Sequence, residues 1–188
     1  MKILVTAFGP FDGRPLNASS LALHALKAGF PRIHTRILPV DSVIAPSRLK
    51  HAMRRLRPDI LLMLGEAAGS NAVRLETTAW NELDFRIPDI KGRQPSKRPI
   101  LPKGPDSYSS SLPLAKWNTA LARAGHPVSF SDDPGRYLCN QVFYAAMNHI
   151  HTTGLPCRAG FIHLPLAADY PTGKAADALS DMLRGINS

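Results

Sequence analysis

The sequence predicts a single α/β domain over residues 1–188, with helices packed on a twisted, mostly parallel central sheet. Short apolar runs of strand length alternate with longer segments whose apolar residues recur at helical spacing. One run, Ile60–Gly65, is apolar without interruption, as in a strand buried on both faces. A chain of 188 residues that is 44% hydrophobic is long enough to bury one full core.

The first half of the chain is expected to alternate strand and helix. A strand over Lys2–Phe8 leads through a Gly- and Pro-rich loop to a helix that Asn17 or Ser19 could cap. Apolar spacing then sets the next elements. These are a helix at Ser20–Ala28, a strand at Arg32–Leu38, a helix at Pro46–Leu56, the Ile60–Gly65 strand and one further strand within Ala72–Trp80.

The second half begins with a long Pro-rich connection, Asn81–Ser111. A connection of this length inside a compact domain is usually functional or mobile. Gly125 is a candidate end signal for the helix after it. The remaining predicted elements are a helix at Leu112–Ala124, a strand at Pro127–Ser131, a helix from Cys139 to His151, a strand at Arg158–Pro165 and a helix at Asp177–Ile186.

The charge and the cysteine content limit the classes of function. The net charge of +9 permits nucleic-acid binding, but the densest basic run, Arg48–Arg57, fits a helix with a solvated charged face. No run approaches the roughly 18 apolar residues of a membrane span. The apolar run Ile3–Phe8 is too short for a signal peptide. Because two cysteines make neither a disulfide framework nor, without clustered histidines, a metal spacing, we expect a cytoplasmic protein with reduced thiols and no metal site.

Cys139 is the first candidate for chemistry, because it falls where a predicted helix begins. Unpaired N–H groups at that helix terminus favour a thiolate, although a lone cysteine is also often a small buried hydrophobe. A cysteine nucleophile needs a base, and His163 ends a predicted core strand, where sites collect in this fold class. A single histidine in such a strand is, however, more often a structural residue. Glu76 could orient that histidine or could instead pair with Arg74.

Two loops could line a site near these residues. Phe8 and Phe11 flank a turn-rich loop, where aromatic side chains indicate either a core plug or an apolar pocket. The segment Gly65–Ser70 follows a buried strand but lacks the Gly-Lys-Ser/Thr of a phosphate loop.

Five motifs in order give the chain a resemblance to the pyroglutamyl peptidase I family of cysteine peptidases. The family patterns are T-G-F-x-P-F-G-G…N, E-x-x-A-x-N…R-I-P-D, G-P-x-x-Y…L-P, G-T-[FY]-[VL]-C-N and G-F-I-H-[VI]-P. The matching segments here are Thr6–Gly13 with Asn17, Glu76–Asn81 with Arg86–Asp89, Gly104–Tyr108 with Leu112-Pro113, Gly135–Asn140 and Gly160–Pro165.

The resemblance implies a three-layer α/β/α domain with a mixed, mostly parallel sheet, as in phosphorylase- and hydrolase-like folds. It implies a Cys139–His163–Glu76 triad that forms a thioacyl-enzyme without a cofactor. The oxyanion would be held by the Cys139 N–H and Arg86. The chain is expected to form a homo-oligomer, a dimer or tetramer, and to act on N-terminally pyroglutamylated peptides. The implied substrate-binding residues are Phe8, Phe11, Asn17, Gly65, Glu66, Ile87, Tyr137 and Leu138.

Several positions depart from the family pattern. Glu66 replaces a usual Gln, Ile90 a usual Asn and Ser109 a common aromatic residue, while Ala7 and Asp12 replace glycines. The Glu66 side chain could point into the pocket, where it would repel the lactam carbonyl. We favour the other arrangement, in which the backbone faces the substrate and the carboxylate points outward, toward one of the many arginines. Three alternatives remain: an impaired family member, a phosphorylase-like α/β enzyme and a basic nucleic-acid-binding module.

Overall fold

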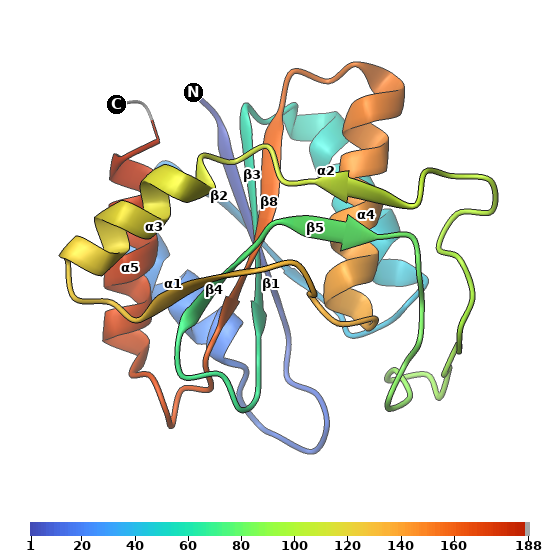
Figure 1. Cartoon of the computed structure of the whole chain (residues 1–188), viewed down its shortest axis with the longest axis horizontal. Helices are drawn as coiled ribbons and strands as arrows, with labels where there is room; N and C mark the ends of the chain where they lie inside the picture. Colours follow the sequence, from blue (N-terminus) through green and yellow to red (C-terminus); the bar gives the residue numbers. More distant parts are fainter. Residues whose placement is uncertain (187–188) are drawn as a thin grey trace.

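The computed structural model describes residues 1–186 and has a six-stranded sheet at its centre (Figure 1). The sheet order is β2-β1-β3-β8-β4-β7; the first four strands are parallel, β4 runs antiparallel to β8, and β7 is parallel to β4. The predicted mixed, mostly parallel sheet is thus confirmed. The strands are β1 (Ile3–Phe8), β2 (His34–Leu38), β3 (Ile60–Glu66), β4 (Val73–Glu76), β7 (Val128–Ser131) and β8 (Arg158–Leu164).

Helices cover both faces of this sheet and complete three layers, as Figure 1 shows. One face carries α1 (Ala18–Gly29), α3 (Leu114–Arg123) and α5 (Thr172–Arg184). The other carries α2 (Ile44–Leu56) and α4 (Leu138–Thr153). Along β3, Leu62 and Leu64 face the first layer whereas Leu61 and Met63 face the second, because successive strand side chains point to opposite faces.

The segment Ala72–Trp80, expected to be one strand, is divided between two sheets. After β4, Thr77 donates its N–H to Ser131, and the chain then enters β5 (Thr78–Trp80). β5 pairs with β6 (Ser107–Ser109) in a separate two-stranded antiparallel sheet. The strand prediction missed this change of sheet because it depends on a partner almost 30 residues away.

The connection between β5 and β6 is held in place by hydrogen bonds rather than lacking structure. Leu83 and Arg98 form an antiparallel bridge, and the Asn81 side chain bonds to the backbone of Leu101. A backbone hydrogen bond from the Phe85 N–H to the Pro95 carbonyl adds a further link. These contacts fix the part of the connection that leads to the pocket.

Asp89 anchors the same connection to the loop before α2. Its carboxylate accepts hydrogen bonds from the N–H groups of Ser42, Lys91 and Arg93 and from the Ser42 hydroxyl. The Arg93 guanidinium bridges Asp89 and Asp41, at 3.2 and 2.9 Å. Burial alone would raise the pKa of Asp89, but these hydrogen bonds hold the pKa well below its ordinary value.

Helix boundaries follow local capping. The Asn17 side chain accepts the Ser19 N–H at 3.0 Å, so Asn17 rather than Ser19 caps α1. α2 begins at Ile44, two residues before the expected start, because the Asp41 carboxylate accepts the N–H groups of Val43 and Ile44. α5 begins at Thr172 instead of Asp177 and ends at Arg184, which lets Ala175 join the core.

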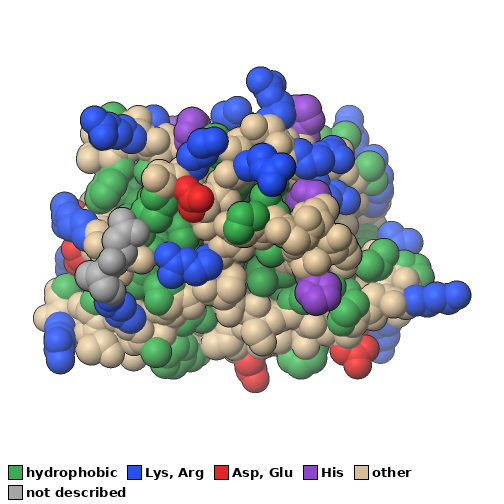
Figure 2. All heavy atoms as spheres, turned by 90° about the horizontal axis from the view of Figure 1, so that it is seen from above, with side chains coloured by type: hydrophobic (Ala, Val, Ile, Leu, Met, Phe, Trp, Pro, Cys, Tyr) green, Lys and Arg blue, Asp and Glu red, His purple; other side chains and the backbone are tan. Residues whose placement is uncertain are grey.

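Basic side chains gather at the end of the sheet where the parallel strands begin, which Figure 2 views directly. α2 buries Ala45, Leu49 and Met53 and exposes its cations, as the amphipathic pattern predicted. Arg54 and Arg55 form no ion pair with any carboxylate among residues 1–186. Within that same range, every helix is too short or too polar to cross a lipid bilayer.

Candidate active site

A pocket of about 330 Å³ opens where β1, β3 and β8 end, at the opposite end of the sheet from the basic face. This is the edge at which ligands bind in open α/β sheets. The structure gathers here most of the residues proposed from the sequence. Its lining is Phe8, Phe11, Arg14, Asn17, Val40, Glu66, Ala67, Ala68, Arg74, Arg86, Ile87, Asp133, Pro134, Gly135, Tyr137, Leu138, Cys139 and His163.

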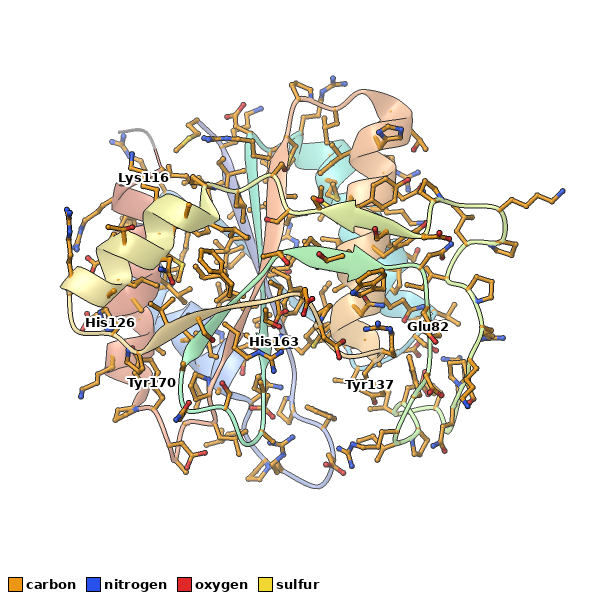
Figure 3. All side chains as sticks on the ribbon, viewed as in Figure 1. Glu82, Lys116, His126, Tyr137, His163 and Tyr170 are labelled. Carbon is orange, nitrogen blue, oxygen red and sulfur yellow. The ribbon has the colours of Figure 1, made fainter. Side chains whose placement is uncertain are left out.

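His163 lies in β8, between β3 and β4, and is almost wholly buried (Figure 3). Its Nδ1 atom lies 2.7 Å from Glu76 Oε1, a contact that joins residues 87 positions apart. The carboxylate therefore fixes the ring so that Nε2 remains available for another partner.

Glu76 ends β4 and is fully buried, and it contacts both of the partners that the sequence left open. Its Oε1 atom lies 2.7 Å from His163 and also 3.4 Å from Arg74 Nε. The Arg74 guanidinium is in turn held by the Ser131 hydroxyl and the Asp133 carbonyl. The Oε2 atom of Glu76 has no hydrogen-bond partner among residues 1–186. Histidine and arginine thus share one oxygen of the carboxylate.

Cys139 is the second residue of α4 and faces the pocket at the helix N-terminus. Asn140 fixes this terminus, because its side chain accepts the Trp80 N–H and donates to the carbonyls of Trp80 and Glu82. Gly65, opposite His163 in the β3–β8 register, lies so close that a Cβ there would come within 2.9 Å of Cys139 Sγ. A residue without a side chain is therefore required at this position.

The charge of His163 is coupled to its two neighbours. Burial by itself would lower the pKa of His163. The Cys139 thiolate, and then the hydrogen-bonded Glu76 carboxylate, raise that pKa to about 9. The buried imidazole of His163 is therefore held mainly in its protonated form near neutral pH.

Aromatic and aliphatic side chains form the pocket walls. The Phe11 ring stacks on Tyr137 with centroids 6.1 Å apart, and the Phe85 ring packs against Tyr137 in a tilted arrangement with centroids 4.5 Å apart. The Tyr137 hydroxyl donates to the Pro88 carbonyl, and burial is the main cause that raises the pKa of Tyr137 to about 12. Phe8 is nearly buried and extends this apolar wall into the core.

Some polar groups at the pocket already have hydrogen-bond partners, whereas others are available to a ligand. The Asn17 side-chain oxygen is occupied by Ser19, whereas its amide nitrogen has no hydrogen-bond partner among residues 1–186. The Arg86 guanidinium is exposed and, within the described chain, likewise has neither a hydrogen-bond nor an ion-pair partner. Ile87 follows it on the same segment. These unpaired donors could bind the oxygens of a ligand.

The Glu66 carboxylate does pair with an arginine, but the expectation that it points outward is wrong. Its side chain is only 4% exposed and lies 2.8 Å from Arg14, and it also accepts the Ala18 N–H at 2.8 Å. The first turn of α1 and the Arg14 loop supply these partners, and both are distant in sequence.

Sequence reasoning also missed several lining residues, among them Arg14, Val40 and Asp133. The unusual acid at position 66 was the one available signal for Arg14, because a buried carboxylate requires a cation or several donors. The others show no signal in the sequence alone.

The second cysteine plays a different part. Cys157 is buried in the α2–α4 layer, and burial raises its pKa to about 12, which makes it a weak nucleophile. Among residues 1–186, no three or more His, Cys, Asp and Glu side chains gather in a group that could hold a metal ion.

Comparison with known proteins places the chain among named peptidases. A family model described as pyroglutamyl peptidase matches residues 1–183. A pyrrolidone-carboxylate peptidase from Pyrococcus furiosus is 38% identical over 168 residues, covering 88% of this chain and 81% of the relative. One from Vibrio vulnificus is 35% identical, covering 95% of this chain and 85% of its own.

Solved structures agree in fold. The X-ray structure of pyrrolidone carboxyl peptidase from Pyrococcus furiosus superposes with a TM-score of 0.92 at 32% identity, covering 99% of this chain and 98% of the other. Pyroglutamyl peptidase I from Bacillus amyloliquefaciens gives a TM-score of 0.91 at 28% identity, with 98% and 96% coverage.

Proposed function

The chain belongs to the pyroglutamyl peptidase family, and on that premise we propose that it is a cysteine peptidase that removes N-terminal pyroglutamate from peptides. The observation that carries the proposal is the 2.7 Å contact between His163 and the buried Glu76, beside a cysteine at a helix N-terminus in the same pocket. A nucleophile, its base and an orienting carboxylate are the elements of a catalytic triad.

In the proposed reaction Cys139 Sγ attacks the carbonyl carbon of the pyroglutamyl residue. His163 holds the thiol proton and transfers it to the leaving amine as the C–N bond breaks, which leaves a thioacyl-enzyme. His163 then takes a proton from water, and the hydroxide releases pyroglutamate and restores the thiol. Glu76 keeps the imidazole oriented and stabilises its cation.

The oxyanion of the tetrahedral intermediate is proposed to bind the Cys139 backbone N–H and the Arg86 guanidinium. The Cys139 N–H lies in the first turn of α4 and has no acceptor among residues 1–186. Such preorganised donors contribute about 3–4 kcal/mol each to transition-state binding.

The pocket suits a flat, uncharged lactam. Phe8, Phe11 and Tyr137 offer apolar contact to the ring, and the free Asn17 amide can donate to an acceptor on its edge. The backbone of Gly65 and Glu66 and the side chains of Ile87 and Leu138 are proposed to complete the slot. Because an unpaired ammonium is costly to bury, this lining disfavours an ordinary N-terminus.

A fluorogenic pyroglutamyl amide tests the proposal. We expect the wild-type protein to release the fluorophore, a thiol alkylator to stop the reaction, and Cys139→Ser to lower kcat/KM by about three orders of magnitude or more. The matched control is Cys157→Ser, which should change the rate little because Cys157 lies outside the pocket.

Two results would contradict the proposal. Full activity in Cys139→Ser would remove the nucleophile, and a requirement for inorganic phosphate would favour the phosphorylase-like alternative. The expected homo-oligomeric state and cytoplasmic location remain predictions, which size-exclusion chromatography with light scattering and cell fractionation would test.

A further inference from the structure

Beside the pocket, the buried carboxylate of Glu66 depends on a single cation. Oε2 accepts the Ala18 N–H at the start of α1, whereas Oε1 lies 2.8 Å from Arg14 and has no other polar partner among residues 1–186. Glu66 ends β3 in the middle of the sheet, where its backbone pairs with Leu164. The carboxylate therefore cannot easily move to solvent if Arg14 is lost.

Arg14 also contacts the aromatic wall of the pocket. Its guanidinium carbon lies 5.0 Å from the centre of the Phe11 ring, within cation–π range. The Arg14 N–H bonds to the Phe11 carbonyl across a tight turn, in which Asp12 and Gly13 both adopt positive φ. Arg14 therefore joins the charged side of the pocket to its aromatic side.

Phe11 also contacts the residue that caps α4, the helix that carries Cys139. Its ring stacks on Tyr137, which caps α4 two residues before Cys139. The end of β3, the β1–α1 loop and the start of α4 thus meet through Glu66, Arg14, Phe11 and Tyr137. The end of β3 and the start of α4 already meet where Gly65 approaches Cys139, and Arg14 and Phe11 add the β1–α1 loop to this contact.

We propose that the Arg14–Glu66 ion pair is a specificity latch, which holds Phe11 against the ligand ring and cancels the negative charge beside the pocket. This inference rests on the proposed function. The latch makes the pocket select the neutral lactam ring of pyroglutamate against the ring of an N-terminal proline. The proline ring has the same size, but its nitrogen is protonated near pH 7. Arg14 and Glu66 are positioning residues and take no part in bond breaking.

Removing the positive charge of Arg14 and removing the negative charge of Glu66 have different consequences. Arg14→Met keeps an unbranched apolar stem near Phe11 but leaves the Glu66 carboxylate unpaired, so a cationic ring becomes a favourable replacement. Glu66→Gln retains an acceptor for the Ala18 N–H and removes the negative charge. The double variant is neutral again.

The test compares the wild type, both single variants and the double variant. For each, KM and kcat are measured with a pyroglutamyl fluorogenic amide, and L-prolinamide is tested as a competitive inhibitor. In Arg14→Met we expect KM to rise and the inhibition constant of L-prolinamide to fall, each about tenfold, with kcat nearly unchanged. The double variant should return prolinamide inhibition to within about threefold of the wild type.

Controls separate the latch from other roles of Arg14. Arg32→Met alters an exposed arginine outside the pocket and should leave every constant unchanged. Arg14→Lys keeps the charge and should keep prolinamide excluded. If Arg14 acted only in folding, or bound substrate directly, Glu66→Gln would not rescue Arg14→Met; failure of that rescue would overturn the proposal.

Urea unfolding of the same four proteins gives a readout that does not need activity. If the two residues form one unit, the double variant should unfold near the midpoint of Glu66→Gln alone. Additive shifts would mean that the side chains act independently and would refute the latch. Absence of pyroglutamyl hydrolysis in the wild type would refute the proposed function instead. The urea unfolding midpoints of the four proteins would still show whether Arg14 and Glu66 stabilise the fold as a pair.

Discussion

Replacing Gly65 with alanine should disable the site by displacing Cys139, the proposed nucleophile. A Cβ at this position would lie 2.9 Å from Cys139 Sγ and 2.9 Å from two carbons of the Phe161 ring, shorter than ordinary contact by about half an ångström. The backbone cannot retreat, because β3 is paired on both sides by β1 and β8. The Phe161 ring is also confined, since it is fully buried between Phe143 and His163. The sulfur is therefore the atom that must move.

The size of the effect follows from these contacts. Misplacement of a reacting group by about 1 Å can cost roughly 10²-fold in rate, so we expect Gly65→Ala to lower kcat/KM by about that factor. This equals about 2.7 kcal/mol of transition-state binding. Overpacking should also lower the free energy of unfolding by about 1–3 kcal/mol.

The assay is hydrolysis of the pyroglutamyl amide, together with the rate at which iodoacetamide alkylates Cys139. The matched control is Gly173→Ala, because a Cβ at Gly173 meets nothing within 4 Å and the residue lies in the first turn of α5. It should leave activity unchanged and raise stability by up to about 1 kcal/mol. Activity of Gly65→Ala within about threefold of the wild type would refute the steric reasoning.

Four further predictions concern charge and anchoring. The pKa of His163 is raised to about 9, above its ordinary 6.5, so the stability that its charge contributes should be complete below about pH 6.5 and lost as pH rises through 9; kcat/KM should fall over the same alkaline limb. Glu76→Gln removes the negative charge that helps to raise the pKa of His163, so the alkaline limb of the kcat/KM profile should shift to lower pH. A pH profile that does not move would contradict the role of Glu76. Asp89→Asn loses ionic contact with Arg93, so hydrogen exchange in the β5–β6 connection should accelerate while the core strands stay protected; equal protection would show that other contacts hold the connection. Because the pKa of Asp89 is lowered, its contribution to stability should be present above about pH 4 and decline in stronger acid, which pH-dependent unfolding of wild type and Asp89→Asn can measure.

Patterns that act over short stretches of chain can be read from the sequence. The alternation of apolar runs predicts the strands β1, β3 and β8 and the helices between them, because strand and helix periodicities are local properties. The motifs around Cys139, His163 and Glu76 likewise identify the candidates for the proposed triad, since each motif needs only a few neighbouring residues. The capping role of Asn17 belongs to the same class.

Contacts between distant segments are decided only by the tertiary structure. The Glu76 carboxylate serves His163 and Arg74 together because β4 lies antiparallel to β8, a pairing that no local pattern specifies. The division of Ala72–Trp80 between two sheets depends on β6 in the same way. Glu66 is the clearest case. Its position in the sequence allows either an exposed or a buried carboxylate, and the arrival of Arg14 and the α1 N-terminus at the end of β3 makes the buried, neutralised state possible.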